Sequence, residues 1–532
     1  MKRTTTAACG LSLSLVAAAL AGCGGGSAGG GGEASYVDGG TFTLAMSSDP
    51  GNLDPQMGAG TTLFTVSQFA YDPLVSVDGK TGEIKSGLAK SWDVKDTTIT
   101  LTLNADITCS DGARMTASDV ARNLDFITDP ASKSPFTGTF FPAGAKSVAD
   151  DAAGTVTVTL AKPAPFVLNG LANLPMVCPS GLADRTSLKT ATAGTGPYQL
   201  TEAAPGDHYT YTVRDGYKWG PDGATTATKG LPKTVVVKVV QNETTAANLL
   251  LSGGLNAAQV SGPDADRLAK SGLYSTETPA LVGEQWYNHA EGRVTSDVKV
   301  RKALTQALDL AQLRKVLTSD QGGAATTLAS NEPVACTGDS VSKALPAFDA
   351  KAAAALLDEA GWKAGADGKR AKDGKPLSLV FLYQNNNGSA GDAAAELAVQ
   401  QWKAVGVDAT ARSQDETTLT STIFGAGDWD VSWVSLNVSS PDQLVPFLSG
   451  PPAPAGTNFA AIANPDYDKA VTAAMAIPGV AGCADWLAAE SGLIANADIV
   501  PFASKSARTF GKGAEFQTPG LLIPTSIRVL AK

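Results

Sequence analysis

The chain has 532 residues, of which 43% are apolar and 17% charged, and its formal net charge is −10 at pH 7. These proportions are typical of folded globular proteins, and they exclude a disordered or fibrous chain. Because binding along a nucleic-acid backbone requires basic surfaces, the negative charge argues against nucleic acid as a partner. At roughly 100–200 residues per domain, the length predicts about two to four compact units.

The first residues have the pattern of an export signal. Two basic residues precede an apolar run that is shorter than the ~20 apolar residues of a membrane span. The run ends at residues 20–23, Leu-Ala-Gly-Cys, which resemble a bacterial lipobox, where a peptidase cuts before the cysteine and its thiol carries lipid. We therefore predict a lipoprotein signal peptide over 1–22, a lipid anchor at Cys23 and a Gly-rich tether over 23–35. An ordinary signal peptide with a chance cysteine is the alternative.

Alternating apolar residues predict strands in the first half of the chain. The pattern occurs over 41–46, 98–103 and 155–160. Between the last two, Thr116 is the predicted N-cap of an amphipathic helix. Residues 233–240 are nearly continuous valine, which predicts a strand buried on both faces.

Longer helices separate the strands in the second half. Apolar residues at helical spacing predict helices over 295–308, 352–360 and 393–405. Strands are predicted over 377–383 and 407–411. Because strands alternate with helices at this spacing, we expect a partly parallel α/β sheet.

A series of short motifs occurs in one order along the chain. They lie at residues 39–55, 71–75, 87–92, 110–112, 116–120, 195–198, 300–304, 361–362, 373–377 and 428–431. Together they resemble the family-5 extracellular solute-binding proteins, the oligopeptide- and dipeptide-binding type. The resemblance runs from about residue 39 to the C-terminus.

The resemblance implies an α/β fold of the two-lobed periplasmic-binding-protein type (type II, large peptide-binding class). Lobe one is expected over 36–283, with an inserted subdomain at about 73–193, and is completed by 500–532. Lobe two is expected over 284–499. Such lobes close by a hinge and bury a solute between them.

The resemblance also implies the partners of the protein. We expect a monomer that binds a small solute, peptide-like or otherwise polar, and delivers it to an ABC permease and ATPase complex. The lipid at Cys23 would hold the protein at the outer face of the cell membrane. A surface lipoprotein that senses its ligand without transport needs the same cleft and is the alternative function.

Four cysteines remain beyond the signal and the anchor, namely Cys109, Cys178, Cys336 and Cys483. Four cysteines allow three pairings, and an exported protein can form disulfides. In the implied layout each lobe holds one pair, so we predict Cys109–Cys178 and Cys336–Cys483. Metal binding is the alternative, but no CxxC spacing and no nearby histidine supports it.

Candidate solute contacts combine aromatic walls with amides that fix orientation. They are Ser48, Asp49 and Asn52 on the first polar loop, Trp286 and Tyr287 near a crossover, Tyr383, Gln384, Asn385 and Asn386 after a strand, and Trp433 with Asn437. Core packing is the alternative for each aromatic residue, and an exposed turn is the alternative for the asparagines.

Family members that take peptides commonly bind the α-ammonium with an aspartate shortly after a tryptophan. Here that position falls at Leu436 or Asn437, so the carboxylate is missing. A buried ammonium without a counter-charge is costly, which argues against a peptide with a free amine. A neutral, modified or sugar-like solute remains open, as does a shifted anchor such as Asp49 or Glu284.

Enzyme signatures are missing from the sequence. The chain has only two histidines, His208 and His289, and beyond the Gly-rich tether it has no GxSxG motif. The phosphate-loop-like residues 79–81 and the dinucleotide-like residues 194–196 each lack a required glycine. Few histidines and 6 methionines disfavour nickel or haem as cargo. We predict a binding protein that has no catalytic residues, no cofactor and no metal site.

Overall fold

The computed structural model describes residues 35–531 except 59–60, 80 and 415. The predicted signal peptide, Cys23 and the tether up to residue 34 lie outside the described residues. Among the residues that are described, none of the helices has the length and apolar character needed to cross a bilayer.

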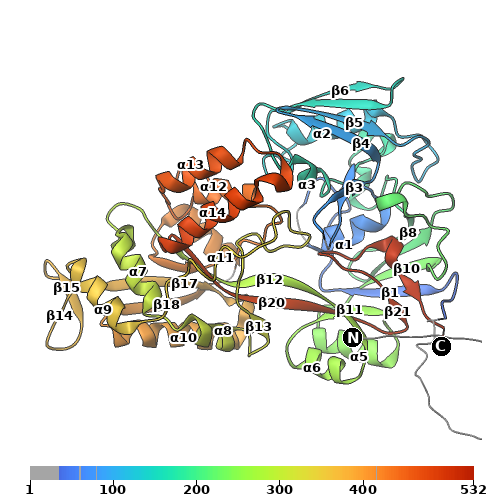
Figure 1. The fold of residues 1–532 in the computed structure, drawn as a ribbon. Helices are drawn as coiled ribbons and strands as arrows, with labels where there is room; N and C mark the ends of the chain where they lie inside the picture. Colours follow the sequence, from blue (N-terminus) through green and yellow to red (C-terminus); the bar gives the residue numbers. More distant parts are fainter. Residues whose placement is uncertain (1–34, 59–60, 80, 415, 532) are drawn as a thin grey trace, which may run out of the picture. The chain divides into compact units, whose positions relative to one another are not determined.

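A mixed β-sheet is the central element of the fold (Figure 1). In the described part of the chain it has 11 strands. Their order is β18 (Asp408–Gln414), β17 (Ser378–Gln384), β19 (Val431–Trp433), β12 (Tyr274–Tyr287), β20 (Ile499–Gly511), β11 (Ala257–Val260), β1 (Thr41–Met46), β10 (Thr234–Val239), β9 (His208–Val213) and β8 (Tyr198–Ala204), with β13 (Gly322–Gly323) on β20. The pairs β1–β10, β1–β11, β17–β18 and β17–β19 are parallel, which confirms the partly parallel α/β sheet.

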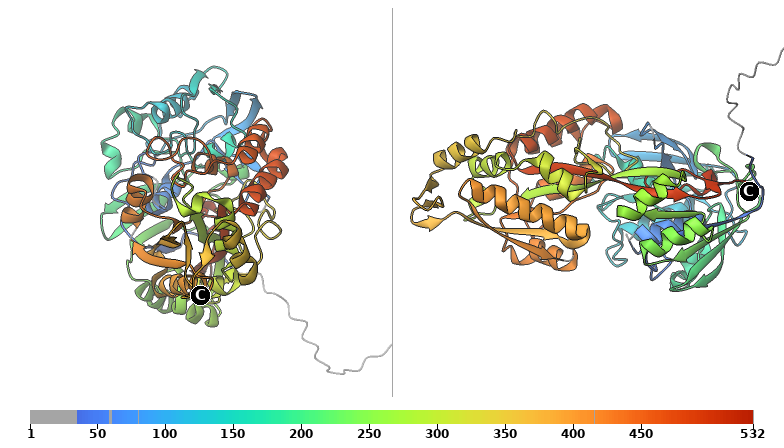
Figure 2. Two further views of the ribbon diagram at one scale, coloured as in Figure 1. Left: turned by 90° about the vertical axis from the view of Figure 1, so that its left-hand side faces the viewer. Right: turned by 90° about the horizontal axis from the view of Figure 1, so that it is seen from below.

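The two long strands β12 and β20 connect the two halves of this sheet (Figures 1 and 2). The expected lobe boundaries at 283/284 and 499/500 fall inside these strands, and we use lobe one and lobe two below as names for the residues on either side of these boundaries. Bulges on both sides of Gly283 interrupt their pairing. A Cβ at Gly283 would lie 2.7 Å from the Phe502 ring, so glycine is needed for this close approach.

The segment expected to form the inserted subdomain, which we call the subdomain below, has its own sheet and core. Its strand order is β4 (Ala89–Lys95), β5 (Thr98–Leu103), β7 (Thr155–Thr159) and β6 (Lys146–Asp150), and α2 (Ala117–Thr128) contacts β6 and β7. Thr116 caps α2 as predicted, and Asp119 completes a capping box. Alternation along β5 and β7 buries Ile99 and Val156 against this helix.

The rest of lobe one surrounds the other half of the main sheet. Its further elements are α1 (Thr61–Ala70), β2 (Val75–Val77), β3 (Ile84–Ser86), α3 (Val167–Leu171), α4 (Pro179–Ala183), α5 (Glu243–Ser252), α6 (Gly262–Lys270), β21 (Ala514–Glu515) and β22 (Arg528–Val529). The prediction that 233–240 is buried on both faces is wrong. Val235 and Val237 are fully buried, but Lys238 on the opposite face of β10 is exposed.

Lobe two places helices on both faces of its strands. The helices are α7 (Val298–Gln306), α8 (Leu310–Leu317), α9 (Ala350–Glu359), α10 (Gly388–Ala404), α11 (Glu416–Ser421), α12 (Val445–Leu448), α13 (Pro465–Ala474) and α14 (Cys483–Ala495). A small antiparallel sheet comprises β14 (Lys363–Ala364), β15 (Arg370–Lys372) and β16 (Lys375–Pro376). The helix predicted over 295–308 is confirmed as α7, which Asp297 caps and which ends at Gln306, and Asp309 then caps the next helix, α8.

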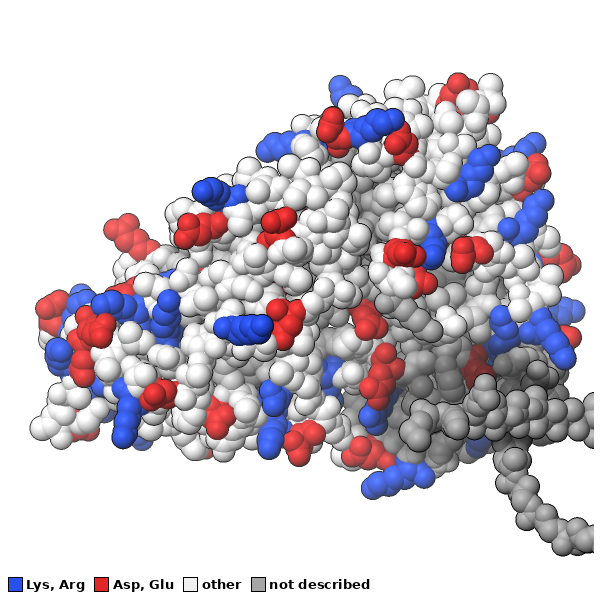
Figure 3. Space-filling view, viewed as in Figure 1, with Lys and Arg blue, Asp and Glu red and all other residues white. Residues whose placement is uncertain are grey.

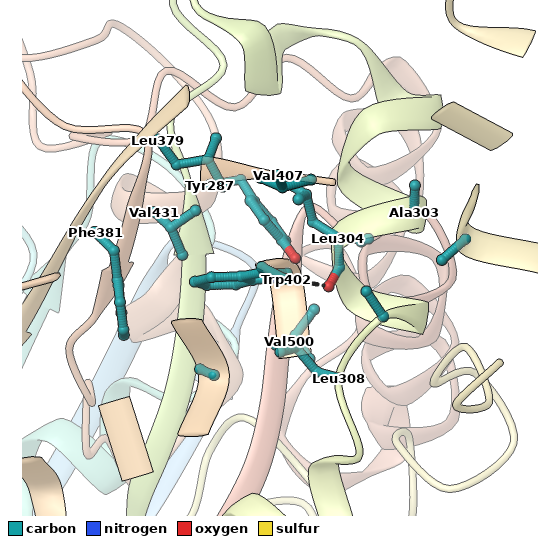
Figure 4. Close-up of a cluster of buried hydrophobic side chains, with 14 of the residues drawn as sticks. Tyr287, Ala303, Leu304, Leu308, Leu379, Phe381, Trp402, Val407, Val431 and Val500 are labelled. Carbon is teal, nitrogen blue, oxygen red and sulfur yellow. Dashed lines mark hydrogen bonds between the residues drawn. The ribbon is translucent and has the colours of Figure 1, made fainter. Parts of the chain in front are cut away.

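Alternate residues of the lobe-two strands enter two different cores. Tyr287 and Phe381 pack with α7 to α10, where Trp402 donates a hydrogen bond to the Leu304 carbonyl (Figure 4). Their neighbours Trp286 and Leu382 point to the opposite face and pack with α13 and α14. Because these strands are buried on both faces, they hold the residues that follow them in fixed positions.

Two disulfides hold segments that are distant in sequence. One joins Cys109 to Cys178 in the inserted subdomain, and the other joins Cys336 to Cys483 in lobe two. These are the pairs expected from the lobe layout. Each closes a long loop, which restricts the unfolded chain and thereby favours the folded state.

Candidate functional site

The carboxyl ends of β17 and β19 border a cavity of about 80 Å³, which we term the sheet-end cavity. Its lining residues are Leu281, Val282, Leu317, Tyr383, Gln384, Asn387, Gly391, Trp433, Ser435 and Asn437. Open α/β sheets commonly bind ligands at the carboxyl ends of their strands. At this volume the cavity has room for a few water molecules or a small functional group.

Trp433 forms the aromatic wall of the sheet-end cavity. Its ring packs 4.9 Å from Phe381 and 5.1 Å from Phe502, and its Nε1 donates a 2.9 Å hydrogen bond to Gln285. The side chain is only 6% exposed. Trp433 is therefore mainly a core residue whose edge reaches the cavity.

The remaining chemistry of the sheet-end cavity is neutral. All of its lining residues are described, and none of them is charged. Tyr383 donates a hydrogen bond of 2.8 Å to Asp392, and burial raises the pKa of the Tyr383 hydroxyl, which stays protonated at neutral pH. The cavity thus offers amides, hydroxyls and aromatic edges.

A second cavity, of about 340 Å³, lies between the inserted subdomain and lobe two, and we term it the interlobe cavity. The subdomain contributes Gly138, Thr139, Phe140, Phe141, Pro142, Ala143, Ala161, Lys162, Pro163, Ala164, Phe166, Val167 and Gly170, and lobe two contributes Ser440, Asp442, Gln443 and Met475. Its volume falls in the range of small-molecule sites, about 300–1,000 Å³.

Direct contacts between the lobes flank the interlobe cavity. The Gly479 amide donates a 2.9 Å hydrogen bond to the Pro165 carbonyl. The rings of Phe166 and Trp486 lie 6.0 Å apart, which brings the start of α3 against α14 (Figure 1). Both lobes are thus needed to form the walls of this cavity.

Asp442 supplies a carboxyl group to the interlobe cavity. It lies in the short helix η6 (Pro441–Leu444), which Ser440 and Gln443 stabilise by a capping box. Burial raises the pKa of Asp442 to about 6, while a hydrogen bond from the Ser440 hydroxyl acts in the opposite direction. Lys162, on the subdomain side, is exposed. The lining is otherwise aromatic, apolar or neutral.

Four of the sequence-predicted residues, Tyr383, Gln384, Trp433 and Asn437, line the sheet-end cavity. Trp286 and Tyr287 do not, and their prediction as solute contacts is corrected by complete burial. The cause is the position of β12 between β19 and β20, with a core on each face. Core packing, the alternative interpretation, applies to both side chains.

The first polar loop lies away from both cavities, whose linings include neither Ser48, Asp49 nor Asn52. Asp49 accepts hydrogen bonds from the Tyr209 hydroxyl at 2.8 Å and from the Gly206 amide at 2.6 Å. Its carboxylate therefore fixes the loop within lobe one. Asn52 accepts from the Asp54 amide, and Ser48 is exposed.

The asparagine run has no shared role in either cavity. Asn385 is exposed at the start of η4 (Asn385–Asn387), and the side chain of Asn386 lies outside the described residues. Asn387, which was not among the predicted contacts, lines the sheet-end cavity. The turn interpretation therefore fits Asn385.

Sequence reasoning missed the residues of the interlobe cavity. Two signals were present, a Ser-x-x-Gln capping pattern at 440–443 and the neighbouring aromatics Phe140 and Phe141 in a turn-rich stretch. Neither signal indicates that the two segments meet. Their meeting depends on how the lobes pack.

Comparison with known proteins places these features in a family. A model of the bacterial extracellular solute-binding proteins, family 5 (middle region), matches residues 83–451. Protein XP55 of Streptomyces lividans is 29% identical over 376 residues, 66% of this chain and 63% of XP55. The periplasmic murein peptide-binding protein MppA of Escherichia coli K12 is 27% identical over 489 residues, 86% of each chain.

A solved structure shares the fold over nearly the whole chain. It is a substrate binding protein from Microbacterium hydrocarbonoxydans complexed with 4-hydroxybenzoate hydrazide. It is 27% identical, with a TM-score of 0.70 over 92% of this chain and 99% of that chain. This similarity confirms the fold class expected from the sequence. Because the family model matches more than half of its length, the chain belongs to the family 5 bacterial extracellular solute-binding proteins.

Proposed function

We propose that the protein captures a small solute in the interlobe cavity and delivers it, chemically unchanged, to an ABC permease and ATPase complex. The observation that carries the proposal is that walls from both lobes form this cavity. A solute that touches both lobes favours the arrangement in which they meet, and an importer can recognise that arrangement. The MppA relative is itself named as a peptide-binding protein, which supports the binding role.

The lining of the interlobe cavity suggests the chemistry of the solute. Phe140, Phe166 and Met475 offer apolar contact, while Asp442 offers a carboxyl group. We infer a peptide-like or other small polar solute that has a ring or apolar side chain and a hydrogen-bond donor or cation facing Asp442. The Microbacterium protein is described with an aromatic hydrazide, a ligand of this general type.

We also propose that the mature chain begins at Cys23 and is held by lipid at the outer face of the cell membrane as a monomer. Expression of the full chain in a bacterium tests the anchor. The protein should fractionate with membranes, and Cys23→Ala should move it to the soluble fraction. Equal membrane association of both forms would contradict lipidation at this residue.

The first experiment identifies the solute and tests the cavity. Native mass spectrometry of the purified protein should reveal a co-purifying small molecule, whose affinity is then measured by calorimetry. Met475→Trp should fill the interlobe cavity and abolish binding. Val480→Trp is the matched control, because Val480 is 60% exposed and outside the lining. Unchanged affinity in Met475→Trp would exclude this cavity.

The charge of Asp442 gives an independent test. Asp442→Asn should weaken binding of a cationic solute about tenfold and remove the rise in affinity expected as pH increases through about 6, where Asp442 ionises. Asp373→Asn, an exposed carboxyl on the β15–β16 turn, makes the same charge change and should have no effect. An identical pH profile for Asp442→Asn and the unmodified protein would refute a role for this carboxyl.

A further inference from the structure

Glu284 stands at the bulged point of β12, where the strand passes from lobe one to lobe two. It pairs with Pro501 on β20 and is one residue beyond Gly283. Its other neighbour is the segment that follows β19. That segment contributes Ser435 and Asn437 to the sheet-end cavity and continues into the turn that lines the interlobe cavity.

Regular pairing between β12 and β19 stops at Gln285 and Trp433. Beyond this point the amide of Val434 still donates to the Glu284 carbonyl at 3.2 Å. The next amide that faces β12, that of Leu436, donates to the Glu284 side chain, with 2.7 Å between N and Oε2. A side-chain carboxyl therefore takes the place of a strand hydrogen bond where the regular pairing of β12 with β19 has ended.

Two further side chains hold the same segment. Trp286 Nε1 donates to the Val434 carbonyl at 2.9 Å. Asn437 both accepts from the Leu281 amide at 2.8 Å and donates to the Leu281 carbonyl at 3.2 Å. The course of 434–437 thus depends on three side-chain attachments to β12, of which Glu284 is the central one.

The Glu284 side chain is fully buried, and only one of its two carboxyl oxygens accepts a hydrogen bond. Its Oε1 has no hydrogen-bond partner within the part of the chain that the structure describes. Facing it from α14 is a second buried carboxyl, Glu490, which accepts from the Ser340 hydroxyl at 2.7 Å. Pro501 opposite it on β20 and residues 431–437 alongside carry no charge.

We propose that Glu284 is a positioning residue for solute binding, which fixes the 434–437 segment by accepting the Leu436 amide and does so as a neutral carboxylic acid. This inference goes beyond the proposed function, but the measurement of solute affinity that tests it rests on the proposed function. Glu284 does not line either cavity, so it acts through the residues it holds rather than by touching the solute.

The protonation state follows from the surroundings. Burial, with a further contribution from Glu490, raises the pKa of Glu284 to about 8, while the Leu436 amide and the Trp286 side chain act in the opposite direction. The folded state therefore keeps a proton that the unfolded state loses above about pH 4.5. Stability contributed by this group is largest below pH 4.5 and decreases as pH rises towards 8.

Two substitutions test separately the length and the charge of the side chain at position 284. Glu284→Gln keeps the acceptor at the same reach and has no charge, so it should preserve the Leu436 contact and solute affinity. Glu284→Asp keeps an acid but is one methylene shorter, so it should release the Leu436 amide and weaken solute affinity about tenfold. Glu490→Gln is the control, since it neutralises the neighbouring carboxyl without contact to 434–437.

Hydrogen exchange at the Leu436 amide, measured at pH 6 by NMR, reads the contact without any solute. Slow exchange in the unmodified protein, Glu284→Gln and Glu490→Gln, with fast exchange in Glu284→Asp, supports the proposal. Fast exchange in Glu284→Gln, or slow exchange in Glu284→Asp, overturns it. Because this readout needs no solute, it separates failure of the Glu284 inference from failure of the proposed function.

Thermal melting between pH 4.5 and 8 tests whether the Glu284 carboxyl is protonated in the folded protein. The melting temperature of Glu284→Gln should equal that of the unmodified protein near pH 4.5 and exceed it increasingly towards pH 8. This divergence reports the protonation state of Glu284, and it is independent of any effect on solute affinity. Parallel melting curves for the two proteins would overturn the assignment of a buried neutral acid.

Discussion

The sheet-end cavity and the interlobe cavity are built in different ways. The first is formed within one lobe and its crossover strand, by residues that follow β17 and β19, and its lining is neutral. The second needs two segments about 300 residues apart in sequence, and it contains Lys162 and Asp442. The face in Figure 3 shows acidic and basic side chains interspersed. The two cavities therefore differ in the charged residues of their own linings and not in a large charged surface around them.

This difference indicates separate roles. The sheet-end cavity lies along strands that are hydrogen-bonded in one sheet, so it does not depend on the inserted subdomain, whereas the interlobe cavity exists only where the subdomain and lobe two meet. We therefore assign solute capture to the interlobe cavity. We assign the sheet-end cavity to the structural support of the neighbouring segments. The predictions below test this division.

The largest effect is expected at Trp433. Replacing it by alanine should lower the free energy of unfolding by about 3–5 kcal/mol, because the ring packs against Phe381 and Phe502 and leaves a cavity when removed. Urea denaturation followed by circular dichroism measures this loss. Trp433→Phe, which retains most of the packing, should still bind the solute. Loss of binding in the folded Trp433→Phe protein would move solute capture to the sheet-end cavity.

The regular elements were predictable because their signals are local. The Thr116 N-cap, the alternation over 98–103 and the strand over 377–383 each appear where the sequence placed them, within one or two residues. Errors arose where burial depends on distant neighbours. The valine-rich strand β10 is a case, since its sequence does not reveal that one face remains exposed.

The candidate site was only partly predictable for the same reason. Residues at strand ends, such as Tyr383 and Trp433, could be identified because strand ends are common ligand positions. Trp286 could not be distinguished from them, since its burial depends on α14 and Phe459, which are far away in sequence. Asp442 is not among the predicted contacts, and its meeting with Phe140 in the interlobe cavity follows only from lobe packing.

An intermediate effect is expected at Gly170, which lines the interlobe cavity from α3. A Cβ there would lie 2.0 Å from the Phe140 carbonyl oxygen, so Gly170→Ala must displace the 138–142 turn. We expect a loss of about 1–3 kcal/mol in stability, together with weaker solute binding. Thermal denaturation and calorimetry measure the two effects.

Gly492→Ala is the matched control for Gly170. It changes a helical glycine of α14 whose Cβ would meet no atom within 4 Å, and it should stabilise the protein by up to about 1 kcal/mol. If Gly170→Ala is as harmless as Gly492→Ala, the close packing assigned to this wall of the interlobe cavity is wrong.

A smaller effect is expected from the charge of Asp442 without solute. Since burial raises its pKa to about 6, the folded state holds a proton that the unfolded state loses above about pH 4, and stability decreases between these values. Asp442→Asn should therefore match the unmodified protein at pH 4 and exceed it by about 1–2 kcal/mol at pH 7. Denaturation at both pH values measures the difference, and a constant offset would contradict the raised pKa.

The smallest effect is expected at Ser435, whose half-buried side chain lines the sheet-end cavity. Ser435→Ala removes the hydroxyl but keeps the attachments of 434–437 to β12, which involve the backbone of Val434 and Leu436 and the side chain of Asn437. Stability should change by no more than about 0.5 kcal/mol and solute affinity by less than about twofold. A tenfold loss of affinity, measured by calorimetry, would show that the solute reaches the sheet-end cavity. In that case the two cavities would act as one site, and the division argued above would have to be abandoned.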